Sequence, residues 1–325
     1  MKEILLVGVD VSKMTLDMFV KPLGLSLVIP NDQKGFTQWW SQMKKILQPD
    51  TKLMVLMEHT GLYSLKFETF LRKSGVDYCK IPALEIKRSL GMTRGKNDKI
   101  DAERIAGYGW LRRDILTAVP LIEKSIVELK HLLNLRLKLV RDRAGYTNRV
   151  KEMKAAGCLV ALDQQKKIIA FFSQEILILD AAITAHIAAH PELQKTYDLL
   201  CSIKGVGPII AAYMIGNTHN FKRFSNARKF NCYAGIAPFT YQSGTSIKGK
   251  SRVSHLANKD TKTLLHLGAT CAIRWDEELK TYYERKVSEG KNKMSCINAI
   301  RAKMVARMFA VVKRQSPYQQ MAVAA

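Results

Sequence analysis

The hydrophobic pattern of the chain changes near residue 120, and this change constrains the fold more than any other feature. Before it, short apolar runs such as ILLVGVDVS (4–12) and KLMVLME (52–58) have the length of buried strands, and segments of helical periodicity follow them. Strands that alternate with helices in this way indicate an α/β sheet with helices on its faces. We therefore expect an α/β domain over residues 1–118.

Two helices are predicted inside this first domain. Residues 31–47 carry apolar side chains at helical spacing, with Asn31 as the expected N-cap. Residues 61–75 predict a second helix, which Gly75 would close at its C-terminal end.

After the change, residues 119–192 predict a long helical hairpin that resembles a coiled coil. Apolar residues recur there every three to four positions in two stretches, which predicts two amphipathic helices that run antiparallel. The hairpin could pack on its own chain or form a coiled-coil arm between two copies. The repeat is too short to distinguish these two arrangements. The repeating residues are Ile122, Ile126, Leu129, Leu133, Leu137, Val140 and Ala144, then Ile168, Phe172, Ile176, Leu179, Ile183 and Ile187.

Residues 193–315 predict a third, mostly α-helical domain with a glycine-rich middle. In IKGVG (203–207), Gly205 and Gly207 precede an apolar helix that starts at Pro208, a pattern typical of a helix-hairpin-helix turn. Such a turn brings backbone N–H groups and a helix N-terminus close to a phosphate. Residues 316–325 are expected to form a frayed, flexible tail.

The charge of the chain points to a polyanionic partner. The 325 residues carry a formal net charge of +24, and such an excess is the electrostatic footprint of nucleic-acid binding. No apolar run approaches the roughly 20 residues that span a bilayer, and no signal peptide is evident. The six cysteines are scattered without a CxxC pair, which argues against a zinc knuckle or a disulfide framework. We expect a cytoplasmic protein, associated with the nucleoid of a bacterium.

Four carboxylates stand where two strands end and one helix begins. Asp10 ends the first strand and Glu58 ends the 52–58 strand, while Asp98 and Asp101 would share one face of a helix. Open α/β sheets place ligand sites at this carboxyl edge. Each acid alone is unremarkable as a turn or cap residue, but four together need a reason in a basic protein. Oxygen ligands suit Mg²⁺, or Mn²⁺, which assists phosphoryl transfer.

Two further acids lie near these four in the sequence. Asp17 and Glu103 are interpreted as ordinary surface residues.

The last domain concentrates positive charge around its glycines. Between residues 222 and 274 the only acid is Asp260, a balance that suits a nucleic-acid backbone. Tyr233, Phe239 and Tyr241 could stack on bases or belong to the core beneath this face. The cations are Lys222, Arg223, Arg228, Lys229, Lys248, Lys250, Arg252, Lys259, Lys262 and Arg274.

The stretch YQSGTSIKGKSR (241–252) combines serines, glycines and cations without an acid. A serine between flexible glycines in a cationic field could attack a phosphate, provided that it is activated. Chemistry alone does not choose among Ser243, Ser246 and Ser251.

Six motifs carry a resemblance to a known family over about residues 4–315. In this order, the chain resembles the insertion-sequence transposases related to the Piv DNA invertase, which are described as bridge-RNA-guided DNA recombinases. The motifs are GVDVSK, MEHTG, RGKNDKIDAERIA, IKGVG, YAGIAPFTYQSGTSIKGKSRVS and IRAKMVARMF.

The resemblance implies a specific catalytic apparatus. It implies an N-terminal RNase H/RuvC-like domain with a DEDD metal site at Asp10, Glu58, Asp98 and Asp101. It also implies a transposase domain with Ser243 as nucleophile, forming a phosphoserine link to DNA. Gln242 stands where relatives carry an acid, so an orienting role for that neighbour is in doubt.

The resemblance also implies partners. These are donor and target DNA, an element-encoded bridge RNA that pairs with both, and a dimer that assembles into a tetrameric synapse. Gly205, Gly207, Lys248, Lys250 and Arg252 are the expected nucleic-acid contacts.

Other functions compete with this one. A RuvC-type nuclease or junction resolvase would use water as the nucleophile, and a protein-guided invertase would need no RNA. GVDVSK also resembles the first phosphate loop of actin-like ATPases and sugar kinases, but no second Asp-x-Gly loop follows. A non-catalytic nucleic-acid-binding protein would not need the full set of acids.

Overall fold

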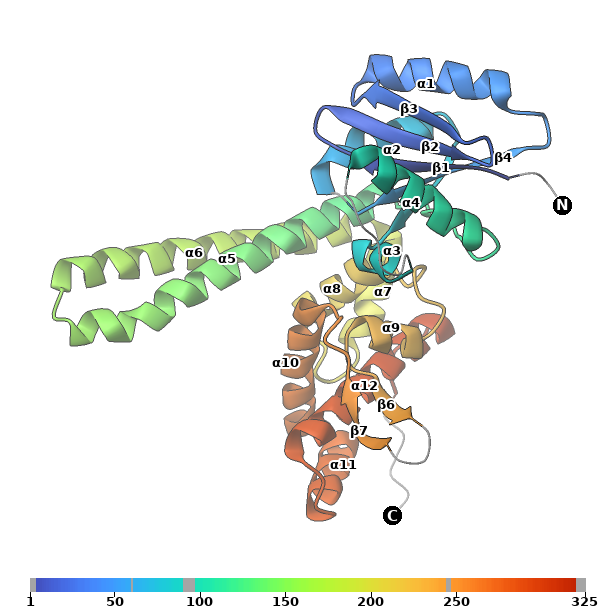
Figure 1. The fold of residues 1–325 in the computed structure, drawn as a ribbon. Coiled ribbons are helices and arrows are strands. Elements are labelled where there is room, and N and C mark those ends of the chain that lie inside the picture. The colour runs from blue at the N-terminus through green and yellow to red at the C-terminus, as the bar shows by residue number, and fades with distance from the viewer. Residues whose placement is uncertain (1–3, 60, 90–96, 244–246, 320–325) are drawn as a thin grey trace. The chain divides into compact units, whose positions relative to one another are not determined.

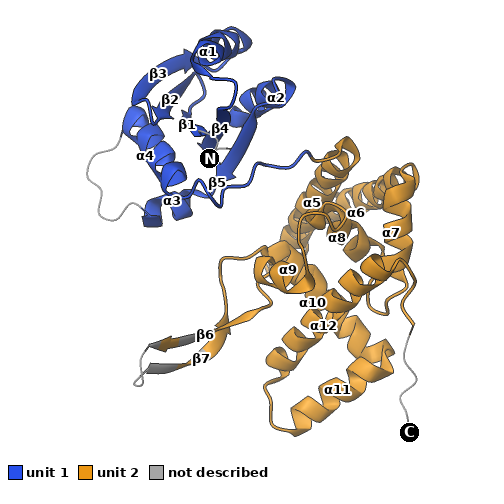
Figure 2. Cartoon of the chain, turned by 90° about the vertical axis from the view of Figure 1, so that its right-hand side faces the viewer, with its two compact units in different colours: residues 1–121 blue, residues 122–325 orange. Residues whose placement is uncertain are grey.

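The computed structural model describes residues 4–59, 61–89, 97–243 and 247–319; for residues 241, 243, 247, 248 and 250 it describes the backbone alone. The chain divides into two compact units, residues 1–121 and 122–325, which are blue and orange in Figure 2. The helical hairpin thus belongs to the second unit. The predicted domain limits at residues 118, 192 and 315 stay predictions.

A five-stranded sheet forms the first unit, in the order β3-β2-β1-β4-β5. The strands β1, β2 and β3 pair antiparallel, whereas β4 and β5 continue parallel to β1. The mixed α/β sheet predicted for this region is confirmed. The strands are β1 (Ile4–Val11), β2 (Thr15–Lys21), β3 (Leu25–Pro30), β4 (Lys52–Glu58) and β5 (Asp77–Ile81).

Helices cover both faces of this sheet because its central strands are apolar on both sides. On one face, Val7 and Val9 of β1 share a core with Phe36 and Phe67. On the other face, Leu6 packs with Ile105. Figure 1 shows α1 and α4 on opposite sides of the strands. The helices are α1 (Gln33–Ile46) and α2 (Leu65–Lys73) on the first face, and α3 (Ala83–Ser89) and α4 (Asp98–Leu111) on the second.

The predicted N-cap of α1 is wrong by one residue. Asp32 caps the helix, and its carboxylate accepts a hydrogen bond from the Gly35 backbone N–H at 2.9 Å. Asn31 instead donates its side-chain amide to the carbonyl oxygens of Ser12 and Tyr63, so it joins two loops. The predicted closure of α2 is confirmed, because Gly75 follows that helix with a left-handed φ of 68°.

The second unit begins with the predicted antiparallel hairpin, α5 (Lys124–Ala155) and α6 (Leu159–Ala188), which Figure 1 shows side by side. Its root is buried through residues such as Leu129 and Ile187, which join the core of the unit. Farther out, Arg136 forms an ion pair with Asp180 across the two helices. Large apolar side chains nevertheless stay exposed along its length, namely Leu135, Leu159, Val160, Phe171, Leu177 and Ile178.

One of these helices is long and apolar enough to cross a membrane by length and composition. An 18-residue window of α6 has a mean hydropathy of 1.7, and 17% of that window is buried. The sequence-based expectation overlooked it because Glu175 and Asp180 interrupt the apolar run. A single such helix is weak evidence for a membrane span.

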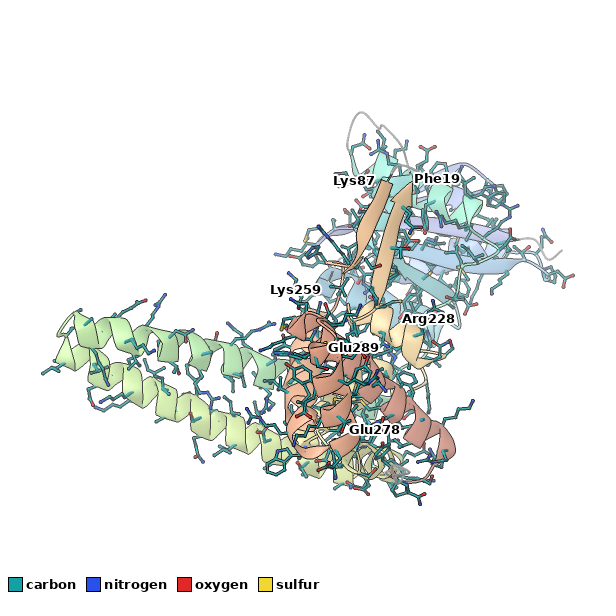
Figure 3. All side chains as sticks on the ribbon, turned by 90° about the horizontal axis from the view of Figure 1, so that it is seen from below. Phe19, Lys87, Arg228, Lys259, Glu278 and Glu289 are labelled. Atoms are coloured by element: carbon teal, nitrogen blue, oxygen red, sulfur yellow. The ribbon has the colours of Figure 1, made fainter. Side chains whose placement is uncertain are left out.

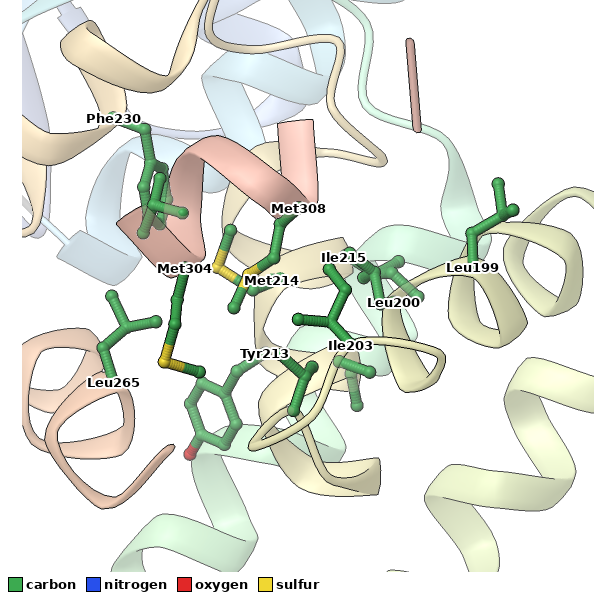
Figure 4. Packing of buried hydrophobic residues seen from close by; sticks show 14 of the residues in the cluster. Leu199, Leu200, Ile203, Tyr213, Met214, Ile215, Phe230, Leu265, Met304 and Met308 are labelled. Atoms are coloured by element: carbon green, nitrogen blue, oxygen red, sulfur yellow. The ribbon is translucent and has the colours of Figure 1, made fainter. Parts of the chain in front are cut away.

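The mostly helical character predicted for the rest of the second unit is confirmed, since six further helices of the described residues pack around one apolar core. The helix α8 crosses the centre of this core, and its Tyr213 hydroxyl donates to the Leu133 carbonyl oxygen of α5 at 2.9 Å. Figure 4 shows Met214, Met304 and Met308 meeting there. The helices are α7 (Pro191–Cys201), α8 (Pro208–Thr218), α9 (Ala227–Tyr233), α10 (Lys259–Trp275), α11 (Glu277–Ser288) and α12 (Lys293–Arg314).

The glycine-rich stretch of the second unit forms a β-ribbon instead of a loop. β6 (Pro238–Ser243) and β7 (Ile247–Val253) pair antiparallel, with an irregularity between Phe239 and Tyr241. Figure 2 shows this ribbon extending from the helical body of its unit. These strands were not predicted because glycine, serine and lysine, which have little β-propensity, interrupt the β-favouring residues of this stretch.

The described start of the expected flexible tail is attached to the body. The backbone N–H of Tyr318 donates to the Ser202 hydroxyl at 2.8 Å, and its ring lies under the guanidinium of Arg307. The expectation of a frayed tail is therefore wrong for residues 316–319.

Candidate active site

Two strand ends bring the first pair of acids together. In β1 and β4, Gly8 pairs with Leu56 and Val9 with Met57, so Asp10 and Glu58 follow at matching positions. Both have the strand phase of Leu56, which faces α4. The half-buried Asp10 and Glu58 therefore lie on one face at the carboxyl ends of adjacent parallel strands.

A helix docked on this face supplies the second pair. Asn97 caps α4 by accepting from the Ile100 backbone N–H at 2.7 Å, which places Asp98 and Asp101 in the first helical turn. The dipole of the helix favours acids there. The sequence-based alternative in which Asp98 is itself the cap is therefore wrong.

A glycine sets the distance between this helix and the sheet. A Cβ atom built on Gly8 would lie 2.3 Å from the backbone nitrogen of Ala106 and 2.4 Å from the carbonyl oxygen of Ala102. Only a residue without a side chain fits at such a separation. Gly8 thus allows α4 to lie directly on β1, close enough for its acids to reach those of the strands.

The electrostatics show that the four carboxylates act on one another. Partial burial, followed by the charges of Asp98, Asp101 and Glu58, raises the pKa of Asp10 from 3.8 to about 6. The structure thus brings together all four acids of the predicted set, although their sequence positions span 92 residues from 10 to 101.

A fifth acid belongs to the same group. Asp17 of β2 stands directly opposite Asp10 in the antiparallel pair, and burial and then Asp98 raise its pKa. The interpretation of Asp17 as an ordinary surface residue is wrong, whereas Glu103 is exposed as expected. We call the group of Asp10, Asp17, Glu58, Asp98 and Asp101 the carboxylate face.

The chemistry of the carboxylate face suits a hard divalent cation. Every donor is a carboxylate oxygen, and their mutual repulsion is what a bound cation would relieve. As the side chains stand, no three His, Cys, Asp or Glu residues in the described ranges are grouped closely enough to hold a metal ion. Asp101 accepts from the Arg104 guanidinium at 2.9 Å, so this bond competes with a metal for that carboxylate.

The serine stretch lies on the second unit. Ser243 is the last residue of β6, and its backbone pairs with Ile247. The side chains of Ser243, Lys248 and Lys250, like the whole of Ser246, lie outside the described part of the chain. The neighbouring Gln242 is exposed, and it pairs in register with Lys248.

The aromatic residues expected near the serine stretch divide between two environments. Phe239 is 50% exposed, whereas Tyr233 packs against the core and Phe230. The side chain of Tyr241 lies outside the described residues. Only Phe239 thus offers a described surface on which a base could stack.

The glycines of the predicted helix-hairpin-helix turn have different surroundings. Gly205 has a φ of 88°, and an added Cβ would lie 2.6 Å from the Gly268 carbonyl oxygen, so tight packing against α10 explains this residue. Gly207 caps α8 through its backbone and has open space around its Cα. Phosphate contact at both glycines stays a prediction.

A wide groove crosses the second unit beside the foot of the β-ribbon. It has a volume of about 1440 Å³, and six cations and two histidines line it, with no acid among its described lining residues. Figure 3 labels two of these cations, Arg228 of α9 and Lys259 at the start of α10. We call this the basic groove. Its cations are Arg228, Arg252, Lys259, Lys262, Arg301 and Lys303.

Arg301 of this groove was not singled out from the sequence. It is only 5% exposed, and in IRAKMVARMF it reads as one cation of an amphipathic helix.

Comparisons with known proteins match both units. The model of the transposase IS116/IS110/IS902 family matches residues 197–284, and a model of DEDD transposases of the IS110 type matches residues 7–153. The second match spans the four predicted carboxylates, and the first spans Ser243.

Individual relatives agree with these models. The chain is 25% identical to the pilin gene-inverting protein of Moraxella bovis over 320 residues, which cover 97% of each chain. The pilin gene-inverting protein of Moraxella lacunata matches to the same extent. An insertion element IS110 protein of 43.6 kDa from Streptomyces coelicolor is 30% identical over 141 residues, 43% of this chain and 34% of the relative.

Proposed function

The chain belongs to the IS116/IS110/IS902 family of transposases, and from this premise we propose that it cuts and rejoins DNA strands through a covalent phosphoserine link. The observation that carries the proposal is the mutual repulsion on the carboxylate face. Burial and the charges of Asp98, Asp101 and Glu58 raise the pKa of Asp10, and burial and Asp98 raise that of Asp17, in a chain whose net charge is +24. Strongly perturbed acids at the edge of a sheet are typical of catalytic sites.

The acids Asp10, Glu58, Asp98 and Asp101 would hold Mg²⁺ or Mn²⁺. When bound, such an ion lowers the pKa of a hydroxyl and stabilises charge on phosphate oxygens. Asp17 stands behind Asp10 and adds negative charge to the same place, which strengthens the attraction for a cation. Arg104 forms an ion pair with Asp101, which a bound metal ion would replace at that carboxylate.

Ser243 would supply the nucleophile. Its hydroxyl oxygen forms a bond to the DNA phosphorus, the bond from phosphorus to a deoxyribose oxygen breaks, and that oxygen takes up a proton as it leaves. A hydroxyl of the other DNA strand then attacks the phosphoserine and releases Ser243. One phosphodiester bond is made for each one broken, so strand exchange needs no ATP.

Specific site choice would come from an RNA partner. The described elements offer the cationic surfaces and the β-ribbon that suit backbone contacts, and backbone contacts carry no sequence information. A bridge RNA that pairs with donor and target DNA would provide the selection by base pairing.

The helical hairpin supports an assembly of several copies. Its exposed apolar side chains, such as Phe171 (60% exposed) and Leu177 (63% exposed), are the surface that a second hairpin would cover. We propose a dimer through this hairpin and a tetramer in the synapse with DNA.

Trapping of the covalent link tests the nucleophile. On a nicked suicide substrate, we expect wild type and Ser251→Ala to form a protein–DNA adduct, and Ser243→Ala to form none while it binds DNA as well as wild type. Ser251 is the matched control because it lies on the paired strand of the same ribbon. An adduct with Ser243→Ala would refute the assignment, and cleavage by wild type without any adduct would indicate the RuvC-type nuclease.

Inversion guided by protein alone is the second candidate, and the similarity to the pilin gene-inverting proteins over 97% of the chain favours it. Recombination assays with purified protein and two DNA duplexes, run with and without the element's RNA, distinguish inversion guided by protein alone from RNA-guided recombination. A site-specific product without RNA would support the invertase and refute RNA guidance.

A further inference from the structure

The basic groove contains a buried cation that lacks a counter-ion. Arg301 of α12 is 5% exposed, and no carboxylate in the described part of the chain forms an ion pair with it. Removing a guanidinium from water costs free energy that a partner normally offsets. Burial lowers the pKa of Arg301, but guanidinium groups keep their proton in proteins. A positive charge therefore stands uncompensated in this wall of the groove.

The contacts of Arg301 hold it in place without neutralising it. One terminal nitrogen, Nη1, donates to the side-chain oxygen of Asn298 at 3.2 Å, and Nη2 lies 2.6 Å from Nδ1 of His266. Nε has no hydrogen-bond partner among the described residues. Both partners are neutral, so they fix the orientation of the guanidinium and leave its charge intact.

These contacts also fix the state of His266. A guanidinium only donates, so Nδ1 of His266 must be the acceptor, and the proton of the neutral ring is on Nε2. Burial and then Arg301 lower the pKa of His266 and favour this neutral form. The ring thus offers one N–H donor, which no protein acceptor takes within the described ranges. Lys262 stands one helical turn away in α10, and it lines the same groove.

We propose that the basic groove binds a phosphodiester of the DNA backbone, and that Arg301, with His266 beside it, supplies the charge and the donors that hold it. A phosphodiester carries one negative charge and free acceptor oxygens, which are what this wall lacks. The assignment to the DNA that is cut rests on the proposed function. The strand β6, which ends at Ser243, begins at Pro238, and Pro238 lines the groove.

The position of the groove defines which phosphate it holds. The six residues of β6 from Pro238 to Ser243 are separated by five steps of extended strand, which span about 17 Å. Successive phosphates of one strand of a duplex rise by about 3.4 Å along the axis. A DNA strand that lies along β6 would place about five nucleotides between the groove and the phosphate that Ser243 attacks. Arg301 would then position the strand without taking part in the chemistry.

Thermal denaturation tests whether Arg301 is an anion site or a structural residue. Arg301→Met removes the charge and keeps the bulk, so we expect it to melt at the same temperature as wild type, or higher, in buffer free of phosphate. Inorganic phosphate should raise the melting temperature of wild type more than that of Arg301→Met. A variant that melts lower than wild type and responds equally to phosphate would show a structural role and overturn the proposal.

Binding of a 30-base-pair DNA duplex tests the same residue on the larger ligand. Loss of one phosphate contact should lower the slope of log Kd against log salt by about 0.9 and weaken binding about 10- to 100-fold. Arg301→Lys should keep most of the slope. Lys280→Gln removes an exposed cation of α11 outside the groove. It should leave the slope nearly unchanged and change the Kd for DNA no more than a few-fold.

Two results would refute the assignment to DNA. One is an Arg301→Met slope equal to that of Lys280→Gln, and the other is weaker binding of an RNA duplex with unchanged binding of DNA. Neither assay requires strand exchange, so a chain that binds DNA on Arg301 but forms no phosphoserine would refute the proposed function alone.

Discussion

The carboxylate face of the first unit and the basic groove of the second each gather charged side chains of one sign, negative in the first and positive in the second. In the first, Asp10 and its neighbours concentrate negative charge, and Arg104 forms an ion pair with one of them, Asp101. In the second, Arg301 and five other cations stand without an acid among the described lining residues. Each site therefore stores electrostatic repulsion that a ligand of opposite charge would release.

The two sites differ in how they relieve that repulsion without a ligand. Asp10, with its pKa at about 6, takes up a proton when the pH falls, whereas Arg301 keeps its charge at every physiological pH. The carboxylate face should respond to pH and to divalent cations. The Arg301 wall of the basic groove should respond to anions and salt, and hardly at all to pH.

The largest expected effect is loss of catalysis on the carboxylate face. Asp10→Ala should lower recombination by about 10³-fold or more, and Asp10→Ala with Asp101→Ala should be little worse, because residues that act as one unit do not add. Glu103→Gln, an exposed acid of the same helix, should keep wild-type activity. Undiminished recombination in EDTA, or strictly multiplicative losses, would contradict a shared cation site.

The next largest effect concerns the packing of α4 on β1, which glycine substitutions change without altering the charge of the carboxylate face. Gly8→Ala puts a methyl group against backbone atoms of α4 that cannot rotate away, and should cost about 1–3 kcal/mol of stability. Gly107→Ala is the control, since it adds a methyl to the same helix in open space and should stabilise by about 0.5–1 kcal/mol. Urea denaturation measures both, and equal effects would show that α4 does not lie against β1 as described.

A smaller effect isolates the stored repulsion. The pKa of Asp10 in the folded protein lies above its ordinary value of 3.8, so the charged form of Asp10 destabilises the fold. This destabilisation is absent below pH 4, where Asp10 is protonated in both states, and is complete above about pH 6. In EDTA at pH 8, Asp10→Asn should therefore stabilise the protein by about 1–2 kcal/mol, after allowance for partial exposure. Thermal melts at pH 4 and pH 8 measure this, and a destabilised variant at pH 8 would contradict the mutual repulsion.

The smallest effect tests the contrast directly. As pH falls from 8 through 6, the affinity for Mg²⁺ should fall because Asp10 gains a proton. Over the same range in EDTA, the ratio of the DNA affinities of wild type and Arg301→Met should change on the order of twofold or less, because His266 stays neutral and Arg301 stays charged. Calorimetry gives the affinity for Mg²⁺ at each pH, and fluorescence anisotropy gives the affinities of wild type and Arg301→Met for DNA. If their ratio changed with pH as much as the affinity for Mg²⁺, the proposed difference between the two sites would be wrong.

The sequence predicted the carboxylate face better than the basic groove because strand ends are visible in one dimension. Asp10 and Glu58 follow apolar runs, and parallel strands bring their ends together. Asp17 was missed because its place depends on the register of an antiparallel pair, which the sequence does not state. The alternation in TLDMFVK, with Leu16, Met18 and Val20 buried, was the available signal.

The basic groove has no comparable pattern. His266 and Arg301 are 35 residues apart on two helices, and helical periodicity predicts which side is buried but not which partner lies there. Arg301 lies on the buried side of α12 between Ile300 and Met304, and this apolar pattern in IRAKMVARMF was a visible hint. The β-ribbon was missed because glycine, serine and lysine interrupt its β-favouring residues, such as Phe239 and Tyr241, and because the sequence does not reveal how its two strands pair.

The separation of the four acids along the chain has a consequence during protein synthesis. A ribosome that has made the strands β1 to β5 has produced Asp10, Asp17 and Glu58 but neither Asp98 nor Asp101. The carboxylate face is completed only when α4 has been translated and has settled against Gly8. A prematurely terminated product that ends before α4 would therefore lack two of the five acids of the carboxylate face.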